Sequence, residues 1–231
     1  MEKRHFVSTV KTAAAAALIA AAVVLCNRTD RQAKLGDINL TLGDFKRSRA
    51  GYEAIVDRDP LDPGARLGLG KAMLQQYCAG TGDSALLTDC ITQLEAARTL
   101  RPDKEVEKLL SVVWFKRASL ALGRRDTLDA ISALSRSISF DPASSKPVNL
   151  AGILYFHRGE PEKALTLFKM ALAIDSLGAY GYFNTGMVYW TEGNFAQAYE
   201  YWYKAALRAP DDKEIITWAA MAKKRRQDGG R

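Results

Sequence analysis

Residues 145–178, SKPVNLAGILYFHRGEPEKALTLFKMALAIDSLG, are followed directly by residues 179–212, AYGYFNTGMVYWTEGNFAQAYEYWYKAALRAPDD. The second stretch repeats the residue classes of the first at a lag of 34 residues. The matching pairs are Gly152 and Gly186, Tyr155 and Tyr189, Gly159 and Gly193, Ala164 and Ala198, Phe168 and Trp202, and Ala171 and Ala205. A repeat of this period predicts stacked structural units, each of which buries its apolar face on the next. Such a chain is built to present a surface rather than to enclose a catalytic pocket.

The residue types at the repeated positions suit a pair of antiparallel helices that pack against each other. Small residues such as Gly186 and Ala198 let two helices approach closely, while aromatic residues fill the space between repeats. Gly193 and Asn194 predict the turn between the helices, where a positive φ is tolerated. Pro210 predicts the end of the second helix, because proline disfavours helical geometry in the residue before it.

This spacing resembles the tetratricopeptide repeat, which has small, aromatic and proline residues at set offsets. The second copy carries the resemblance at Tyr182, Gly186, Tyr189, Gly193, Phe195, Ala198, Trp202, Ala205 and Pro210. Weaker copies precede it and close at Pro142, Pro102 and Pro60, although the first helix of the third copy, around residues 111–123, matches poorly. The resemblance implies an all-α fold, an α-solenoid of about five helical hairpins. The expected units are residues 29–62, 63–104, 105–144, 145–178 and 179–212, which together form a solenoid over 29–212, with a capping helix and basic tail at 213–231.

The N-terminal residues have the pattern of a leader. Residues 1–11 are short and basic, and residues 12–26, TAAAAALIAAAVVLC, contain no charge. A basic start before an apolar run is typical of a signal peptide or signal anchor, here residues 12–28. A helix over 12–26 would span about 22 Å, which is less than a hydrocarbon core of about 30 Å. Including residues 6–10 makes the segment long enough to cross, with Lys11 reaching the interface.

We expect this leader to be a retained single-pass anchor in a bacterial inner membrane, with the repeats in the periplasm or another extracytoplasmic space. Cleavage after Ala22 or near Cys26 is an alternative and would give a secreted protein. Acylation of Cys26 is a further alternative, which Leu25 disfavours because bacterial lipoprotein signals have a small residue at that position. The remaining alternative is that this segment is a buried alanine-rich helix of a cytosolic protein.

The charge of the chain is concentrated at its two ends. The net charge is +7, to which residues 1–11 contribute +2 and residues 223–231 contribute +4. The nearly neutral body between them argues against a nucleic-acid partner, which needs basic residues massed along one surface. The basic tail suits the negative end of a terminal helix. Binding of anionic lipid head groups or an acidic polymer is the alternative.

The sequence gives little indication of catalysis, and we expect a protein that is not an enzyme and uses no cofactor or metal. The only histidines are His5 and His157, and the three cysteines lack the spacing of a zinc site. Gly64, Gly68 and Gly70 lie on a predicted helix with no strand before it, so they do not form a phosphate-binding loop.

Cys78 and Cys90 flank an insertion in the second unit, residues 78–85. Cys78 lies where the first helix of that unit is expected to end, and Cys90 occupies a small-residue position that faces this helix. The two thiols can therefore come within the distance that a disulfide requires. In an oxidising compartment such a bond would contribute about 3 kcal/mol. The alternative is two separate thiols, with Cys90 buried.

The resemblance also implies where a partner binds. In tetratricopeptide proteins, ligand contacts commonly come from positions 2, 5, 9, 12 and 13 of each repeat, counted from its first residue. These positions, called slots below, lie on the first helix of the repeat. In the last two units these slots hold Lys146, Asn149, Ile153, Phe156 and His157, then Tyr180, Phe183, Met187, Trp190 and Thr191. The predicted concave-face site is Asn149, Ile153, Phe156, Tyr180, Phe183, Asn184, Met187 and Trp190. Methionine and aromatic residues suit a peptide or amphipathic helix, although some of these side chains can instead pack between units.

One slot matches the family's carboxylate clamp, which grips the C-terminal carboxylate of a peptide. Asn184 stands in that slot, but the basic partners of the clamp are missing and Asn149 stands where a lysine would. A clamp for chaperone tails is therefore not expected.

These features predict a non-catalytic scaffold that binds a protein or peptide partner in an envelope assembly for secretion, pilus formation or polysaccharide export. One alternative is a chaperone-like peptide binder that receives apocytochrome tails during cytochrome c maturation. The other is an accessory subunit that binds glycan or lipid.

Overall fold

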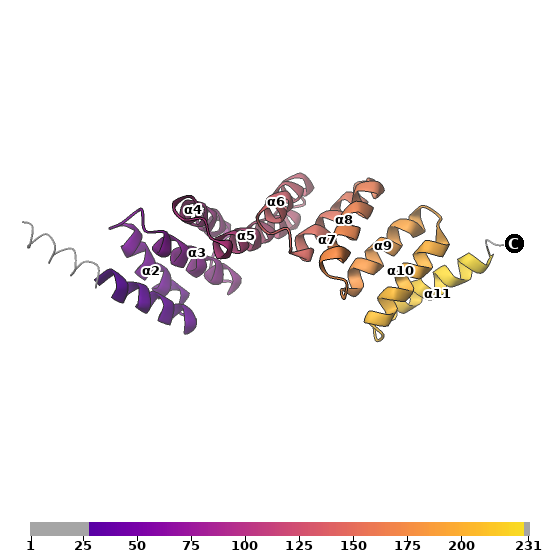
Figure 1. Ribbon diagram of the computed structural model, residues 1–231, viewed down its shortest axis with the longest axis horizontal. Helices are drawn as coiled ribbons and strands as arrows, with labels where there is room; N and C mark the ends of the chain where they lie inside the picture. Colours follow the sequence, from indigo (N-terminus) through magenta and orange to yellow (C-terminus); the bar gives the residue numbers. More distant parts are fainter. Residues whose placement is uncertain (1–27, 229–231) are drawn as a thin grey trace, which may run out of the picture. The chain divides into compact units, whose positions relative to one another are not determined.

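The computed structural model describes residues 28–228, which form α-helices joined by short turns and contain no β-strand (Figure 1). This confirms the predicted all-α class. The predicted N-terminal segment, residues 1–11, and the apolar run 12–26 lie outside the described residues. None of the described helices is long and apolar enough to cross a membrane.

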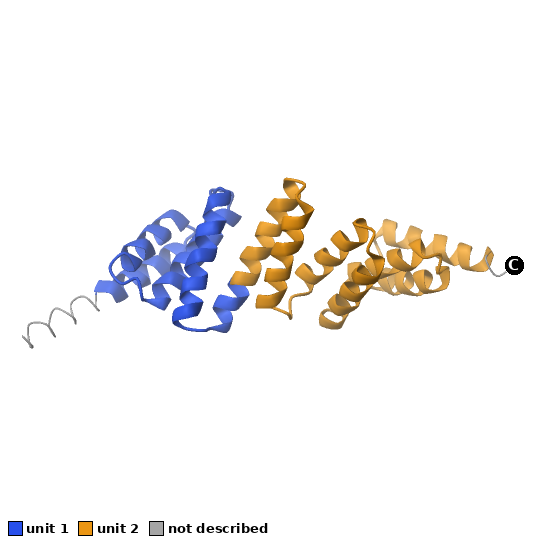
Figure 2. Cartoon of the chain, turned by 90° about the horizontal axis from the view of Figure 1, so that it is seen from above, with its two compact units in different colours: residues 1–109 blue, residues 110–231 orange. Residues whose placement is uncertain are grey.

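The helices follow one another as antiparallel pairs. Residues 28–41 are helical at the start of the described chain. The helices after them are α2 (Phe45–Val56), α3 (Pro63–Cys78), α4 (Ser84–Leu100), α5 (Lys104–Gly123), α6 (Thr127–Phe140), α7 (Ser145–His157), α8 (Pro161–Ile174), α9 (Ala179–Thr191), α10 (Phe195–Arg208) and α11 (Lys213–Asp228). The chain divides within α5 into two compact units, residues 1–109 (unit 1) and residues 110–231 (unit 2) (Figure 2). The candidate binding residues all belong to unit 2.

Many of the helices begin at a side chain that caps them. Asp44, Asp62, Asp83, Asp126 and Asn194 each accept a hydrogen bond from a backbone N–H in the first turn of the following helix. These N–H groups have no partner inside the helix, so each cap contributes about 1 kcal/mol and fixes the residue at which the helix starts. The short turns between paired helices are therefore encoded locally.

A glycine in the first helix of a hairpin faces a large side chain from the second helix. In unit 2, Gly152 faces Phe168 and Gly186 faces Trp202, and a Cβ added to either glycine would lie 2.5 Å from the facing ring. Trp202 is fully buried and donates its Nε1–H to the carbonyl of Phe183 at 2.9 Å. The helices can approach this closely only because neither glycine carries a side chain.

Unit 1 contains the same kind of contact. Gly36 and Gly68 both face the ring of Tyr52, and Gly70 faces Leu94. The hydroxyl of Tyr52 donates to the Asp37 carboxylate at 2.6 Å, so this buried ring also has its polar group satisfied.

The turn between the helices of a hairpin needs a residue whose backbone adopts the left-handed conformation, with a positive φ. Gly193 has φ 75° and Gly159 has φ 77°, which confirms the prediction for Gly193. At the corresponding position of the α5–α6 hairpin, Arg125 has φ 61° and is the one non-glycine residue with positive φ among the described residues. A left-handed conformation costs a non-glycine residue about 1–2 kcal/mol.

We therefore expect Arg125→Gly to raise the free energy of unfolding by about 0.5–1 kcal/mol, since glycine removes the left-handed strain but adds chain entropy to the unfolded state. Urea denaturation followed by circular dichroism measures the change. The matched variant is Gly193→Arg, which places a side chain in open space at the same turn position and should destabilise by a similar amount. Equal stability of the wild type and both variants would contradict this explanation.

Candidate partner-binding surface

The candidate site is the surface formed by α7 and α9, the first helices of the two best-matched repeats; we call it the first-helix face of unit 2. Its helices are joined by a hydrogen bond from Asn184 Nδ2 to Asn149 Oδ1, 3.0 Å long. Positions three and four residues apart lie on one side of a helix. This spacing aligns Asn149, Ile153 and Phe156 on α7, and Tyr180, Phe183 and Met187 on α9.

An apolar cavity of about 200 Å³ opens on the first-helix face. It is lined by Ile153, Phe156, His157, Phe168, Phe183, Asn184 and Met187. Phe168, from α8, is 1% exposed, while Phe156, Phe183 and Met187 are half-buried. The structure therefore brings five of the predicted site residues together, namely Ile153, Phe156, Phe183, Asn184 and Met187.

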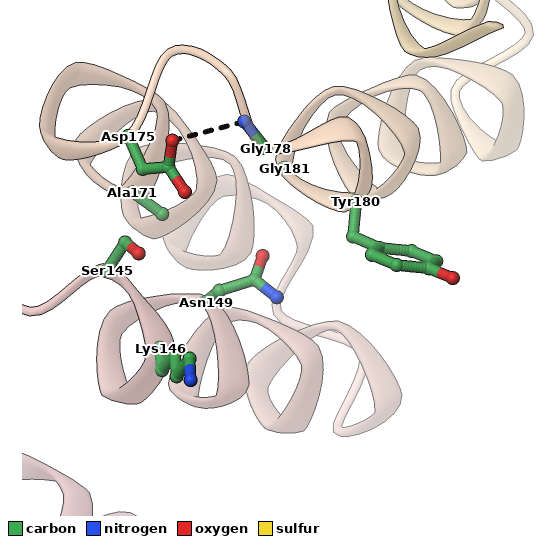
Figure 3. Close-up of a pocket in the computed structure, with 8 residues that line it drawn as sticks. All are labelled: Ser145, Lys146, Asn149, Ala171, Asp175, Gly178, Tyr180 and Gly181. Atoms are coloured by element: carbon green, nitrogen blue, oxygen red, sulfur yellow. Dashed lines mark hydrogen bonds between the residues drawn. The ribbon is translucent and has the colours of Figure 1, made fainter. Parts of the chain in front are cut away.

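A second cavity, of about 190 Å³ and more polar, lies between the first turn of α7, the end of α8 and the first turn of α9 (Figure 3). It is lined by Ser145, Lys146, Asn149, Ala171, Asp175, Gly178, Tyr180 and Gly181. The Asp175 carboxylate accepts hydrogen bonds from the backbone N–H groups of Leu177 and Gly178, at 3.1 Å each. This carboxylate is therefore engaged in holding the α8–α9 turn.

Two predicted residues, Asn149 and Tyr180, line this polar cavity rather than the apolar one. Tyr180 is 64% exposed, and its hydroxyl lies 3.5 Å from the Asp212 carboxylate, so it is available to a partner. Asn149 is half-buried and points from α7 toward α9 (Figure 3).

Trp190 lies in a different environment from the other predicted site residues. Its ring is 5.5 Å from that of Trp202, 4.9 Å from that of Phe195 and 5.8 Å from that of Trp218, all measured between centroids. These contacts join α9 to α10 and α11, and Trp190 lines neither cavity of the first-helix face. Its contacts are packing contacts, and its role in partner binding stays a prediction.

Sequence reasoning missed two features, one on the first-helix face and one in unit 1. Phe168 lines the apolar cavity, although its match with Trp202 marked it only as a core residue. In unit 1, a cavity of about 260 Å³ lies beside Asp37, Tyr52, Asp62 and Lys71. Burial and the hydrogen bond to Asp37 raise the pKa of Tyr52, which keeps its hydroxyl a donor. The repeat pattern gives no signal for this cavity.

Cys78 and Cys90 are free thiols in the structure. Cys78 is exposed at the end of α3, and Cys90 is buried on α4, where its thiol donates to the Gly70 carbonyl at 3.2 Å. The Cys78–Cys90 disulfide stays a prediction for exported protein. Among the described residues, no group of three or more His, Cys, Asp or Glu side chains is placed to hold a metal ion.

Burial raises the pKa of the Cys90 thiol to about 12. The thiolate is the reactive form, and a raised pKa lowers its fraction at every pH below that value. At pH 8 we expect iodoacetamide to label Cys78 in the folded protein and to leave Cys90 unlabelled, as measured by peptide mass spectrometry. Labelling of both at equal rates in folded protein, without denaturant, would contradict this environment for Cys90. A disulfide-linked peptide in non-reduced exported protein would instead establish the predicted bond.

Comparisons with known proteins agree with this architecture. The tetratricopeptide repeat profile matches residues 34–86, 115–179 and 149–214. The chain belongs to the tetratricopeptide repeat family, whose members bind peptides, mediate protein–protein interactions and are generally non-catalytic scaffolds.

Among solved structures, the chain is similar to the MamA protein, with 23% identity over 80% of this chain and 94% of that one, and a TM-score of 0.56. It is also similar to YrrB, described as a tetratricopeptide protein with an unusual peptide-binding site, with 18% identity over 84% of this chain and 90% of that one, and a TM-score of 0.54. At these identities the similarity shows a shared fold. A search of curated protein sequences gives no match.

Proposed function

We propose that this protein is a non-catalytic scaffold whose first-helix face in unit 2 binds a segment of a partner protein. The observation that carries the proposal is the apolar cavity, where half-buried side chains from α7 and α9 surround an open space. Burying one large apolar side chain there would contribute about 2–3 kcal/mol. Because α7 and α9 each pack against the second helix of their own hairpin and are joined by the Asn184–Asn149 bond, the surface is formed before the partner arrives.

A protein segment fits this surface better than a glycan or a lipid chain. The apolar cavity and the polar cavity each hold about one side chain, and the amide groups of Asn149 and Asn184 between them can pair with a peptide backbone. The peptide-binding site named for YrrB supports the same use of the fold. A chaperone-like peptide binder in cytochrome c maturation would use the same surface, and differs in the identity of its partner.

We also propose that the leader at residues 12–28 is retained as an inner-membrane anchor and that the repeats act outside the cytoplasm, in an envelope assembly for secretion, pilus formation or polysaccharide export. The uncharged run after a basic start supports this location. Membrane fractionation together with protease accessibility in spheroplasts tests it. Full-length protein in the membrane fraction, digested from outside, is the expected result; protection from the protease would contradict it, and soluble protein lacking the leader would show cleavage and secretion.

Selection of binding peptides tests the binding role itself. The full chain, purified in detergent, is immobilised and used to select from a displayed library of random peptides. We expect enriched peptides to share a large apolar residue and to lose binding to the Phe156→Ala, Met187→Ala double variant. Enrichment of peptides that bind the double variant equally well would overturn the assignment of this surface.

A further inference from the structure

We propose that the first described helix, residues 28–41, docks one of its faces on a membrane surface that contains anionic lipid. This face, called the outward stripe below, consists of Arg28, Arg31, Leu35, Ile38 and Leu42. The contact rests on the proposed anchoring of the leader, because it concerns how unit 1 lies once the chain is held at a membrane. It uses no residue of the first-helix face of unit 2.

The spacing of the outward stripe places its residues on one side of the helix. They follow one another at intervals of three and four residues, which is the spacing of a single helical face. Leu42 comes directly after the last helical residue, and its N–H donates to the Ile38 carbonyl at 2.9 Å, so it continues this face. A different side of the helix packs on α2, where the Ser48 hydroxyl donates to the Gly36 carbonyl at 2.8 Å. The outward stripe therefore faces away from the core of unit 1.

The apolar residues of the outward stripe occupy positions that are buried in later repeats. Leu35, Ile38 and Leu42 are 51%, 53% and 75% exposed. In the second, fourth and fifth repeats, the counterparts of Leu35 are at most 4% exposed and those of Ile38 at most 8%. These counterparts are Leu69, Ala151 and Thr185 for the first position, and Ala72, Leu154 and Val188 for the second.

The difference in burial comes from the preceding hairpin. In the later repeats, α3 packs on α2, α7 packs on α6 and α9 packs on α8. No hairpin precedes helix 28–41 among the residues that the structure describes. Its outward stripe therefore has the residue types of a packing face but no partner within residues 28–228.

Chain position and charge favour a lipid surface as the partner of the outward stripe. The uncharged run 12–26 ends two residues before Arg28, so insertion of the leader brings the outward stripe to the boundary between membrane and water. Arg28 and Arg31 are exposed, and neither forms an ion pair within the described part of the chain. Basic residues beside apolar ones suit a surface of anionic head groups, where each adds about fivefold to the binding constant. At 3.6 residues per turn, Asp30 and Asp37 lie on another side of the helix, away from that surface.

A second copy of the chain fits the outward stripe less well. Two chains anchored in one membrane would pair these helices in parallel, which places Arg28 and Arg31 against the same residues of the other copy. Like charges at such a seam destabilise it. The three apolar residues also cover only about two turns, whereas a stable helix pair of this kind needs about three or four heptads.

Quenching by labelled lipid tests the docking on the full chain. A genetically encoded, environment-sensitive fluorescent amino acid replaces Ile38 on the outward stripe in one sample and Asp30 in another. Each protein is reconstituted into vesicles of phosphatidylcholine and phosphatidylglycerol, in which part of the phosphatidylcholine carries a nitroxide quencher on its acyl chain. We expect quenching to be at least about threefold stronger at position 38 than at position 30, because the outward stripe enters the interface. Stronger quenching at position 30, which is closer to the leader along the chain, would show a helix that stands away from the membrane and would contradict the proposal.

Substitutions locate the contact. The double variant Leu35→Gln, Leu42→Gln should reduce quenching at position 38 by at least about threefold, because it removes most of the apolar area of the outward stripe. The matched control is Leu128→Gln, Leu177→Gln, at residues of unit 2 that are 69% and 80% exposed, and it should leave the quenching unchanged. Arg31→Glu should weaken quenching in vesicles that contain phosphatidylglycerol and have little effect in phosphatidylcholine alone.

The other outcomes overturn the inference. A blue-shifted emission at position 38 without lipid quenching would show that protein covers the outward stripe. Dependence of that shift on protein concentration would identify a second copy, and independence would identify another segment of the same chain. Weak and equal quenching at both positions would place the outward stripe in water.

Vesicle flotation after an alkaline wash separates this inference from the proposed anchor. Protein that floats with the vesicles but shows no preferential quenching at position 38 would overturn the docking and leave the anchor standing. Protein that the wash removes from the vesicles would overturn both.

Discussion

Replacing Trp202 by alanine should lower the free energy of unfolding of the C-terminal hairpins by about 4 kcal/mol. The side chain is fully buried against Gly186 and donates a hydrogen bond to the Phe183 carbonyl. Its ring is 5.1 Å from that of Trp218 and 6.0 Å from that of Phe183. Alanine would therefore leave a cavity among α9, α10 and α11 and free a backbone carbonyl, and both effects destabilise the same region.

Urea denaturation monitored by circular dichroism measures this loss, since tryptophan fluorescence would change with the substitution itself. The matched variant is Tyr203→Ala, the next residue on α10, whose side chain is 50% exposed; it should change stability by less than about 0.5 kcal/mol. In a stacked repeat protein the loss should remain local, so that α2 to α4 unfold at the same urea concentration as in the wild type. Equal effects of the two substitutions would contradict the core position of Trp202.

The double variant Phe156→Ala, Met187→Ala should weaken the binding of a selected peptide by about 100-fold. Both side chains line the apolar cavity, one from each helix, and truncation of an anchoring contact commonly costs more than 1 kcal/mol. Both are half-buried, so their removal should affect binding more than folding. Isothermal titration calorimetry gives the dissociation constants, and a thermal melt by circular dichroism checks that the variant remains folded.

The matched control truncates two exposed apolar side chains that lie outside the first-helix face. Met170 on α8 is 46% exposed and Leu207 on α10 is 63% exposed, and neither lines a cavity of the first-helix face. The double variant Met170→Ala, Leu207→Ala should bind the peptide as the wild type does. A similar loss in both double variants would show that binding depends on general apolar exposure.

Much of the fold could be predicted from the sequence, because the repeated residues are those that determine helix packing. Gly186 and Trp202 return at the positions of Gly152 and Phe168, and in the structure each glycine faces the large residue of its own hairpin. The turn at Gly193 is a local property of one residue and was predicted correctly. Arg125 shows the limit, because the hairpin geometry there imposes a left-handed conformation that its own sequence does not favour.

The candidate site could be predicted only in part, because spacing along a helix says which side chains share a face but not what they contact. Ile153, Phe156 and Met187 do line one cavity, but Trp190, at an equivalent slot, packs on Trp202 and Trp218. That difference depends on α11, which follows the last repeat and has no counterpart in the pattern. The bond between Asn149 and Asn184 joins two repeats and depends on how closely α7 and α9 approach, so the lag of 34 residues could not reveal it.

Site-specific photocrosslinking in cells tests most directly whether the first-helix face of unit 2 binds a partner. A benzophenone amino acid replaces Phe156 in the apolar cavity in one strain and the exposed Tyr203 on α10 in another. A discrete crosslinked protein adduct from position 156, absent from position 203, is the result that we predict. An adduct from position 203 together with none from position 156 would contradict partner binding at this face.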